Sequence, residues 1–309
     1  MTPTLVRQHL PRTGHGPRVD RRARARDWSE IQERMLVPLY EAVYRRLDVG
    51  SGTRLLGLGC GSGLALLMAA SRGAAVTGVD TSSDRLTLAR ERLLPAGRDA
   101  HARADARIVD GSPGDMAHGD MAHGDMAHGG TADTATSGTG TAGGRSPAYT
   151  VVTAFEPIGC LAGDADGLSE QLTEAVPLAG RGAAVVLAGW GPPERCATAS
   201  VLRVATMLAE PLRGTGTWRP AHRDDLEDVA RRAGLRPDGS GRVACPFGYA
   251  DVDSAVRGLL STGLFDPAIS ATDRIQVDKE IAEALHPYER QDGTVWMPNV
   301  FRYLIARTL

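Results

Sequence analysis

The sequence predicts an α/β protein in which a parallel β-sheet is covered by helices on both faces. Short apolar runs alternate with amphipathic helical stretches along most of the chain, and a glycine-rich turn follows the first such run. Because the helix that connects two parallel strands must pack on a face of the sheet, a repeated strand–helix pattern covers both faces.

Composition excludes several other classes of protein. The 309 residues are 42% hydrophobic, which is ample for a core, and the net charge of −2 lacks the basic surplus typical of nucleic-acid or membrane-surface binding. No apolar run approaches the roughly 18 residues of a membrane span, and the start of the chain lacks the apolar region of a secretory signal. The four cysteines fit neither a disulfide framework nor a zinc pattern. We therefore expect a cytoplasmic protein that binds a small molecule, without nucleic acid, membrane or metal, as a monomer or homodimer.

The first 26 residues predict a disordered basic arm. They hold seven Arg, one Asp and three Pro and show no helical or strand period, so the arm is either solvated or in contact with a partner. Residues 27–47 predict an amphipathic cap helix, because apolar residues recur on one side of it at Ile31, Met35, Leu39 and Val43.

Five strands are expected from short apolar or β-branched runs at residues 54–58, 75–79, 106–109, 149–154 and 183–189. Helical periodicity predicts helices between them at 63–70, 82–94 and 167–179. A helix at 222–233 has acidic residues at its start and arginines at its end, which complement the helix dipole. Two further helices, at 251–261 and 273–285, precede a last strand at 295–305.

Residues 113–147 predict a low-complexity insertion. The segment contains no Val, Ile, Leu or aromatic residue and repeats GDMAH three times, beginning at Gly114, Gly119 and Gly124. Such a run cannot bury enough apolar area to offset its ordering entropy, so we expect a floppy surface loop. Its histidines could in principle bind Ni, Cu or Zn, but slippage during replication of a tolerant loop leaves the same repeat, and we expect no metal there.

The glycine-rich turn after the first strand is the most informative feature. The sequence from Arg54 to Gly63 is RLLGLGCGSG, and glycines at a strand-to-helix turn permit positive φ and a close approach of backbone N–H groups to a ligand. Asp80 ends the second strand, 17 residues after Gly63, where it would face the ribose hydroxyls of a nucleoside or simply cap the next helix. A dinucleotide-binding fingerprint needs glycine at position 64, where this chain has Leu64. This difference argues against a nicotinamide-dependent oxidoreductase.

The pattern G-x-G-x-G at Gly59, Gly61 and Gly63 resembles motif I of the class I S-adenosylmethionine-dependent methyltransferases. The resemblance implies a Rossmann-like, three-layer αβα sandwich with a seven-stranded, mostly parallel sheet and an antiparallel last strand. It implies a single domain over residues 27–309 with an N-terminal helical cap. The implied cofactor is S-adenosylmethionine, and the product is S-adenosylhomocysteine.

Several residues take on cofactor-binding roles through this resemblance. Asp80 resembles the family's ribose-binding acid, and Asp110 resembles the residue that meets the adenine amino group. The full set implied is Trp28, Gly59, Cys60, Gly61, Gly63, Asp80, Thr81, Asp110, Gly111, Ser112 and Phe155. The chain departs from the family at Gly57, where Asp or Glu usually helps to hold the methionine end of the cofactor.

Methyl transfer from a sulfonium is an in-line displacement that depends mainly on alignment, so no triad is needed. An acceptor that must lose a proton needs a base, and the candidates are Glu156 at the end of the fourth strand and His222 at a helix start, either of which could instead be a surface residue. We expect methylation of O, C or N of a small, specialised metabolite. The alternative is a protein that binds the cofactor without methylating, as a cyclase, auxiliary protein or sensor.

Overall fold

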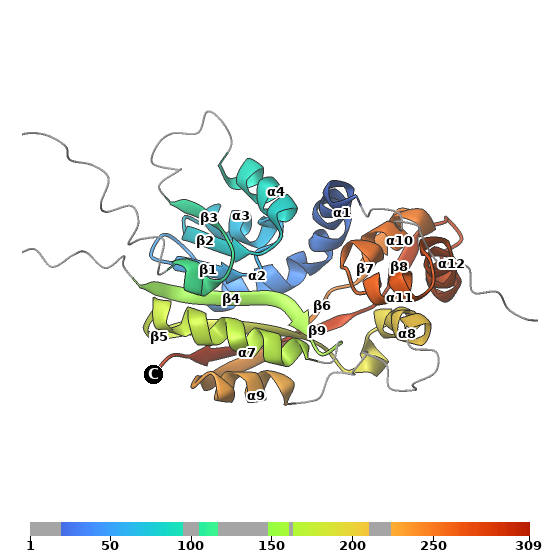
Figure 1. Cartoon of the computed structure of the whole chain (residues 1–309). Coiled ribbons are helices and arrows are strands. Elements are labelled where there is room, and N and C mark those ends of the chain that lie inside the picture. Colours follow the sequence, from blue (N-terminus) through green and yellow to red (C-terminus); the bar gives the residue numbers. More distant parts are fainter. Residues whose placement is uncertain (1–19, 95–104, 117–147, 161–162, 210–223) are drawn as a thin grey trace, which may run out of the picture.

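A seven-stranded sheet forms the centre of the computed structural model, which describes residues 20–94, 105–116, 148–160, 163–209 and 224–309 (Figure 1). The strand order is β3-β2-β1-β4-β5-β9-β6. The first five strands pair in parallel, and β9 runs antiparallel between β5 and β6. The strands span Arg54–Leu58 (β1), Ala75–Asp80 (β2), Ala106–Asp110 (β3), Tyr149–Ile158 (β4), Ala179–Trp190 (β5), Arg236–Ala244 (β6) and Val300–Arg307 (β9). The predicted fold class, including the antiparallel last strand, is confirmed.

Helices cover both faces of this sheet. Successive residues of β1, Leu55 and Leu56, point to opposite faces and belong to two separate apolar clusters. One face packs against α2 (Val37–Arg46), α3 (Leu64–Ala70) and α4 (Ser83–Leu93), and the other against α7 (Asp164–Ala175) and α9 (Asp225–Arg232). Because β1 and β4 are buried on both sides, they are almost continuously apolar, as the sequence pattern indicated.

The register of the sheet gathers the carboxyl ends of its central strands at one edge. Leu58 at the end of β1 lies opposite Val79 on one side and Ala154 on the other, and Asp80 lies opposite Asp110. Ligands of open α/β sheets bind at this edge, beyond the strand ends. The glycine turn, the end of β2 and the end of β4 therefore meet where a ligand is expected.

The N-terminal segment is helical but irregular. It runs through α1 (Arg21–Asp27), the π-helical segment η1 (Trp28–Gln32), the 3₁₀ segment η2 (Glu33–Leu36) and α2. The expected disorder is wrong for residues 21–26, because the Asp20 side chain caps α1 and Arg24 pairs with Asp266. Residues 1–19 lie outside the described part of the chain.

A smaller group of elements packs beside the carboxyl edge. It comprises α8 (Thr198–Ala209), α10 (Val252–Ser261), α11 (Asp266–Ala271), α12 (Arg274–Leu285) and a two-stranded sheet of β7 (Phe247–Tyr249) and β8 (Val295–Met297). Three 3₁₀ turns complete the structure, η3 (Val176–Leu178), η4 (Pro193–Arg195) and η5 (His286–Tyr288). The last expected strand is divided into β8 and β9. The segment after β5, to which the sequence pattern assigned no element, contains α8.

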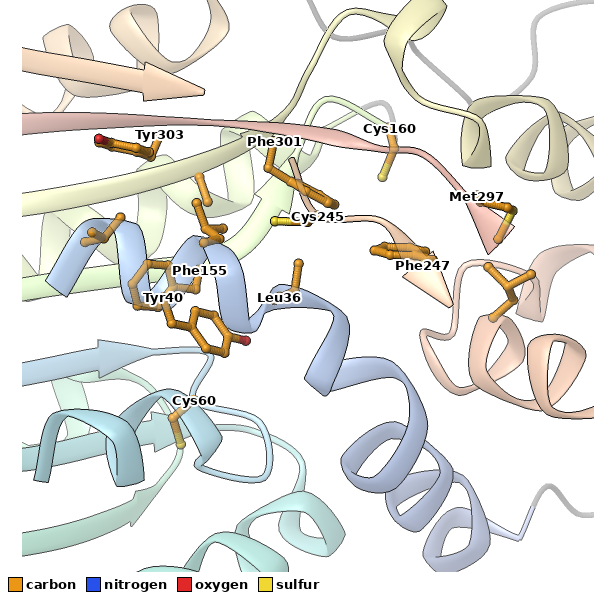
Figure 2. Packing of buried hydrophobic residues seen from close by; sticks show 14 of the residues in the cluster. Leu36, Tyr40, Cys60, Phe155, Cys160, Cys245, Phe247, Met297, Phe301 and Tyr303 are labelled. Carbon is orange, nitrogen blue, oxygen red and sulfur yellow. The ribbon is translucent and has the colours of Figure 1, made fainter. Parts of the chain in front are cut away.

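Aromatic contacts join the sheet to these elements. Figure 2 shows Tyr40 of α2 beside Phe155 of β4, with ring centroids 4.8 Å apart, and Phe247 beyond them. Phe247 in turn packs on Phe301 of β9 at 6.0 Å. One continuous apolar cluster therefore holds this smaller group of helices and strands against the edge of the sheet.

The start of the expected insertion is packed. Met116 is only 4% exposed, and the Gly114 N–H donates to Glu174 Oε2 of α7 at 3.0 Å. Residues 113–116 of the expected insertion are therefore packed; residues 117–147, which carry most of the GDMAH repeat, are outside the structure's described ranges. Within those ranges, no helix has the length and apolar character needed to cross a bilayer.

Candidate functional site

The glycine turn between β1 and α3 has left-handed backbone at all three motif positions. The φ angles are +56° at Gly59, +57° at Gly61 and +80° at Gly63, values that L side chains rarely adopt. At Gly61 a Cβ atom would also lie 3.0 Å from Trp28 Nε1 and 3.3 Å from Glu33 Oε1. Glycine here therefore lets the N-terminal segment close down on the turn.

Asp80 is held in place at the carboxyl end of β2. Its Oδ2 accepts the Gly61 N–H and its Oδ1 accepts the Ser82 N–H, both at 2.8 Å. Ser82, not Asp80, is the N-cap of α4, because the Ser82 hydroxyl accepts the Arg85 N–H. Each oxygen of Asp80 keeps lone-pair capacity for a further donor, such as a ribose hydroxyl.

Glu33 supplies a buried carboxylate behind the same turn. The residue is 2% exposed and accepts hydrogen bonds from the Ser62 hydroxyl, from Arg92 at 2.9 Å and, through Oε1, from the Leu64 N–H at 3.3 Å. Gly63, the N-cap residue of α3, has no side chain to cap the helix, so Glu33 takes that role from a distant segment.

Gly57 cannot be replaced by an acid without rearrangement. A Cβ there would lie 2.9 Å from Leu66 Cδ2 on the first turn of α3. A side chain at position 57 would require the end of the Leu66 side chain to shift, and Glu33 supplies a carboxylate to the turn from the N-terminal segment instead.

A narrow cleft opens at this edge, between the N-terminal segment and the ends of β1 and β4. Trp28, Glu33 and Tyr40 line it from the N-terminal segment, and Phe155 and Glu156 line it from the end of β4. Beside them, the Arg85 guanidinium lies 4.3 Å from the centre of the Trp28 ring. The cleft is therefore walled by aromatic rings and contains charges of both signs.

Glu156 is open to solvent through the cleft, yet the surrounding protein crowds its carboxyl group. This desolvation raises the pKa of Glu156 above its ordinary value; Arg85 opposes the shift and Asp80 adds to it. The Glu156 carboxyl therefore takes up a proton at a higher pH than an ordinary glutamate. Its position beside Gly59 puts it within reach of a group bound in the cleft.

The remaining expected residues lie around this centre. Asp110 and Thr81 are exposed at the ends of their strands, next to Asp80 in the sheet. The Gly111 N–H donates to the Asp80 carbonyl at 3.0 Å, and the Ser112 N–H donates to Asp115 at 2.8 Å. Cys60 lines the cleft, whereas His222 is not among the residues that the structure describes.

A protein-family model, "Methyltransferase domain", matches residues 56–121, a span that contains the glycine turn, Asp80 and Asp110. Residues 56–121 belong to the methyltransferase domain family. This match confirms the resemblance drawn from the motif.

A curated relative of the methyltransferase segment is Methyltransferase GfsG of Streptomyces halstedii, 38% identical over 78 residues. The match covers 25% of this chain and 27% of that relative, so the two proteins correspond over about a quarter of their lengths.

Solved structures align over more of the chain at lower identity. The S-adenosylmethionine-dependent methyltransferase of Thiobacillus denitrificans, in complex with S-adenosyl-L-homocysteine, is 16% identical, with 94% of this chain and 99% of that chain covered and a TM-score of 0.47. Geranyl diphosphate C-methyltransferase of Streptomyces coelicolor A3(2) is 14% identical, with coverages of 96% and 90% and a TM-score of 0.44.

Two polar residues of the cleft are not distinguished by any local sequence pattern. Glu33 is one of several acids within an amphipathic helix, and Arg85 is one of many arginines, so neither stands out in the sequence. Only the tertiary structure puts Glu33 behind the glycine turn and Arg85 over Trp28.

Proposed function

We propose that this protein transfers the methyl group of S-adenosylmethionine to an oxygen, carbon or nitrogen atom of a small, specialised metabolite. The observation that supports this most is the left-handed glycine turn, which lines the cleft and whose Gly61 N–H donates to the Asp80 carboxylate, inside the segment that matches the methyltransferase family.

The residues present fit this cofactor. The Asp80 oxygens have capacity for the two ribose hydroxyls, and Asp110 lies one strand farther along the edge, at a suitable place for the adenine amino group. Trp28 Nε1 is buried beside the turn with no hydrogen-bond partner, so a polar ligand group is needed there. When bound, S-adenosylmethionine supplies an electrophilic methyl group on a positively charged sulfur.

The chain itself contributes alignment and a base. Phe155, packed against Tyr40 at 4.8 Å, gives the cleft a stiff apolar wall that fixes the acceptor. Glu156 then accepts the proton that an acceptor hydroxyl, amine or enol loses as its new bond to the methyl carbon forms and the carbon–sulfur bond breaks. Burial raises the pKa of Glu156, which makes its carboxylate a stronger base than an ordinary glutamate.

The reading without methyl transfer rests on Gly57, which lacks the acid that the family usually carries at this place. A protein that binds the cofactor for another purpose would keep Asp80 and the glycine turn but would have no need of Glu156. The two readings therefore differ in the products that they form and in the role of Glu156.

Calorimetric titration with S-adenosylmethionine, S-adenosylhomocysteine and NAD tests the cofactor. We expect both sulfur nucleosides to bind and NAD not to bind. The D80A variant should lose at least about tenfold in affinity, the equivalent of one charged hydrogen bond, whereas D238A, at a surface pair with Arg307, should match the parent. Failure of both nucleosides to bind would refute the assignment.

Release of S-adenosylhomocysteine in the presence of candidate acceptors tests methyl transfer. The rate should fall on acidification as Glu156 is protonated, at a higher pH than an ordinary carboxyl would require, because desolvation raises its pKa. E156Q should be slow at every pH and lose this acid limb. Cofactor binding with an E156Q rate equal to the parent rate would exclude Glu156 as the base.

A further inference from the structure

Two polar groups beside the glycine turn have unused hydrogen-bonding capacity. Trp28 Nε1 is buried and has no partner. Glu33 uses Oε2 for Ser62 and Arg92, but its Oε1 receives only the long contact from the Leu64 N–H, at 3.3 Å. An unpartnered donor and an acceptor with spare capacity thus flank Gly61. A Cβ at position 61 would lie 3.0 Å from Trp28 Nε1 and 3.3 Å from Glu33 Oε1.

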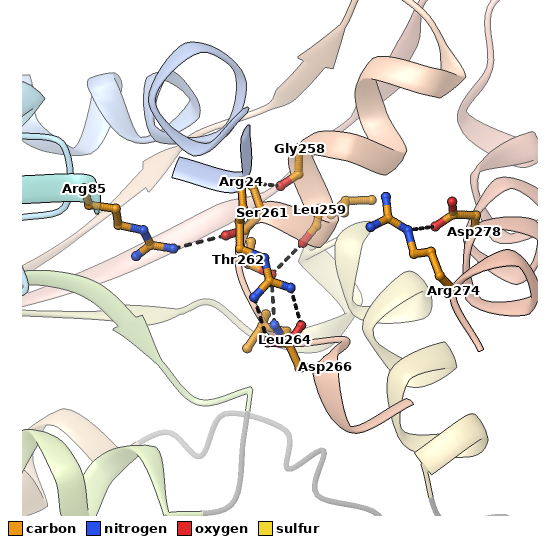
Figure 3. A network of polar contacts seen from close by, with 10 residues as sticks. All are labelled: Arg24, Arg85, Gly258, Leu259, Ser261, Thr262, Leu264, Asp266, Arg274 and Asp278. Atoms are coloured by element: carbon orange, nitrogen blue, oxygen red, sulfur yellow. Dashed lines mark hydrogen bonds and ion pairs between the residues drawn. The ribbon is translucent and has the colours of Figure 1, made fainter. Parts of the chain in front are cut away.

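Arg85 adds a positive charge on the other side of the indole. Its guanidinium lies over the Trp28 ring at 4.3 Å, and one of its nitrogens donates to the Ser261 carbonyl of α10 at 3.1 Å. Figure 3 shows this reach from α4 toward α10. A guanidinium has five N–H donors, so Arg85 keeps donors for the cleft that it lines.

The cleft therefore presents N–H donors at Trp28 and Arg85 and a carboxylate acceptor at Glu33. An α-amino-acid group carries both a carboxylate, which needs donors, and an ammonium, which needs acceptors. Burial of only one of these charges would leave it unpaired, which is costly. A zwitterion is the ligand group that this set of side chains matches on both counts.

We propose that Trp28, Arg85 and Glu33 hold the α-amino-acid end of S-adenosylmethionine, with Trp28 Nε1–H and Arg85 on the carboxylate and Glu33 on the ammonium. This inference rests on the proposed function. The N-terminal segment can cross the turn because residue 61 is glycine. In this proposal the segment holds the amino-acid end of the cofactor, which Gly57 cannot do because it has no side chain.

The test is calorimetric binding of three nucleosides to the full chain. S-adenosylhomocysteine carries the whole amino-acid end, 5′-methylthioadenosine lacks it, and 4-(adenosylthio)butanoate lacks only the ammonium. W28F keeps the ring and removes the N–H, R85Q removes the guanidinium, and E33Q removes the negative charge. W296F, at an exposed tryptophan outside the cleft, is the matched control.

The wild type should bind S-adenosylhomocysteine at least about tenfold more tightly than 5′-methylthioadenosine. W28F and R85Q should each weaken binding of both carboxylate-bearing nucleosides about tenfold, with less than a twofold change for 5′-methylthioadenosine. E33Q should weaken S-adenosylhomocysteine alone. W296F should change none of the three affinities.

Equal weakening of all three nucleosides by W28F and R85Q would overturn the proposal, because these residues would then act only through the fold. So would unchanged S-adenosylhomocysteine binding in both variants. Binding of 5′-methylthioadenosine to each variant shows that the nucleoside site is intact, and R85Q carries the test if W28F does not fold. If the wild type binds no sulfur nucleoside, the proposed function itself fails.

Discussion

Two motif glycines with the same backbone angle allow the packing role of Gly61 to be measured. The φ angles of Gly59 and Gly61 are +56° and +57°, so alanine at either position carries the same left-handed strain of about 1–2 kcal/mol. At Gly59 the new Cβ would meet only the end of the Glu156 side chain, at 3.4 Å. At Gly61 it would press on Trp28 Nε1 at 3.0 Å and on the buried Glu33 at 3.3 Å.

The stability difference between the two variants should therefore report the packing term alone. Overpacking of a well-filled site costs about 1–3 kcal/mol, so we expect the free energy of unfolding of G61A to be lower than that of G59A by that amount. Urea unfolding followed by circular dichroism measures both, with equal m-values showing that the unfolded states are comparable. The double variant W28A/G61A should recover part of the loss, because the clashing atom is absent.

Equal destabilisation of G59A and G61A would refute this reasoning. It would mean that the N-terminal segment moves off the turn at little cost and that Gly61 is required for its φ angle only. Lack of any recovery in W28A/G61A would place the clash elsewhere.

Three further predictions follow from buried charges and thiols. Arg92→Met leaves the buried Glu33 side chain without its ion pair and should lower the free energy of unfolding in urea by about 3–5 kcal/mol. E33Q should restore part of this loss, and an unchanged free energy of unfolding would mean that the ion pair does not stabilise the fold. Desolvation raises the folded-state pKa of Glu156 above its unfolded value of about 4.5, so this group favours folding below that value and loses the effect as pH rises through the folded pKa. The melting temperature of E156Q should therefore be higher than that of the wild type at pH 7 and equal to it near pH 4. The reverse order would contradict the raised pKa. Burial raises the pKa of Cys160 and of Cys245 to about 12, and all four cysteines are buried and outside disulfides. Fewer than one thiol per folded chain should therefore react quickly with a disulfide reagent at pH 8. Rapid reaction of several thiols before unfolding would contradict their burial.

Local sequence patterns determined the sheet and the glycine turn that lines the cleft. Apolar runs such as residues 151–154 are buried on both faces, so their composition alone marks them as central parallel strands. The glycine turn and Asp80 are each recognisable because they sit at the ends of such strands, where the fold class already requires ligands to bind. For the same reason, the family of residues 56–121 could be recognised from a few residues.

The sequence by itself thus determined a mostly parallel α/β fold, the glycine turn and the acid that follows it, because these depend on periodicity and on neighbours within a few positions. Only the tertiary structure decided which side chains meet the turn from elsewhere. Glu33 reaches Leu64 across 31 positions, and Arg85 reaches Ser261 across 176. Such contacts depend on how the irregular N-terminal helix crosses the edge of the sheet, which no local pattern specifies, and they are what makes this cleft electrically suited to a zwitterion.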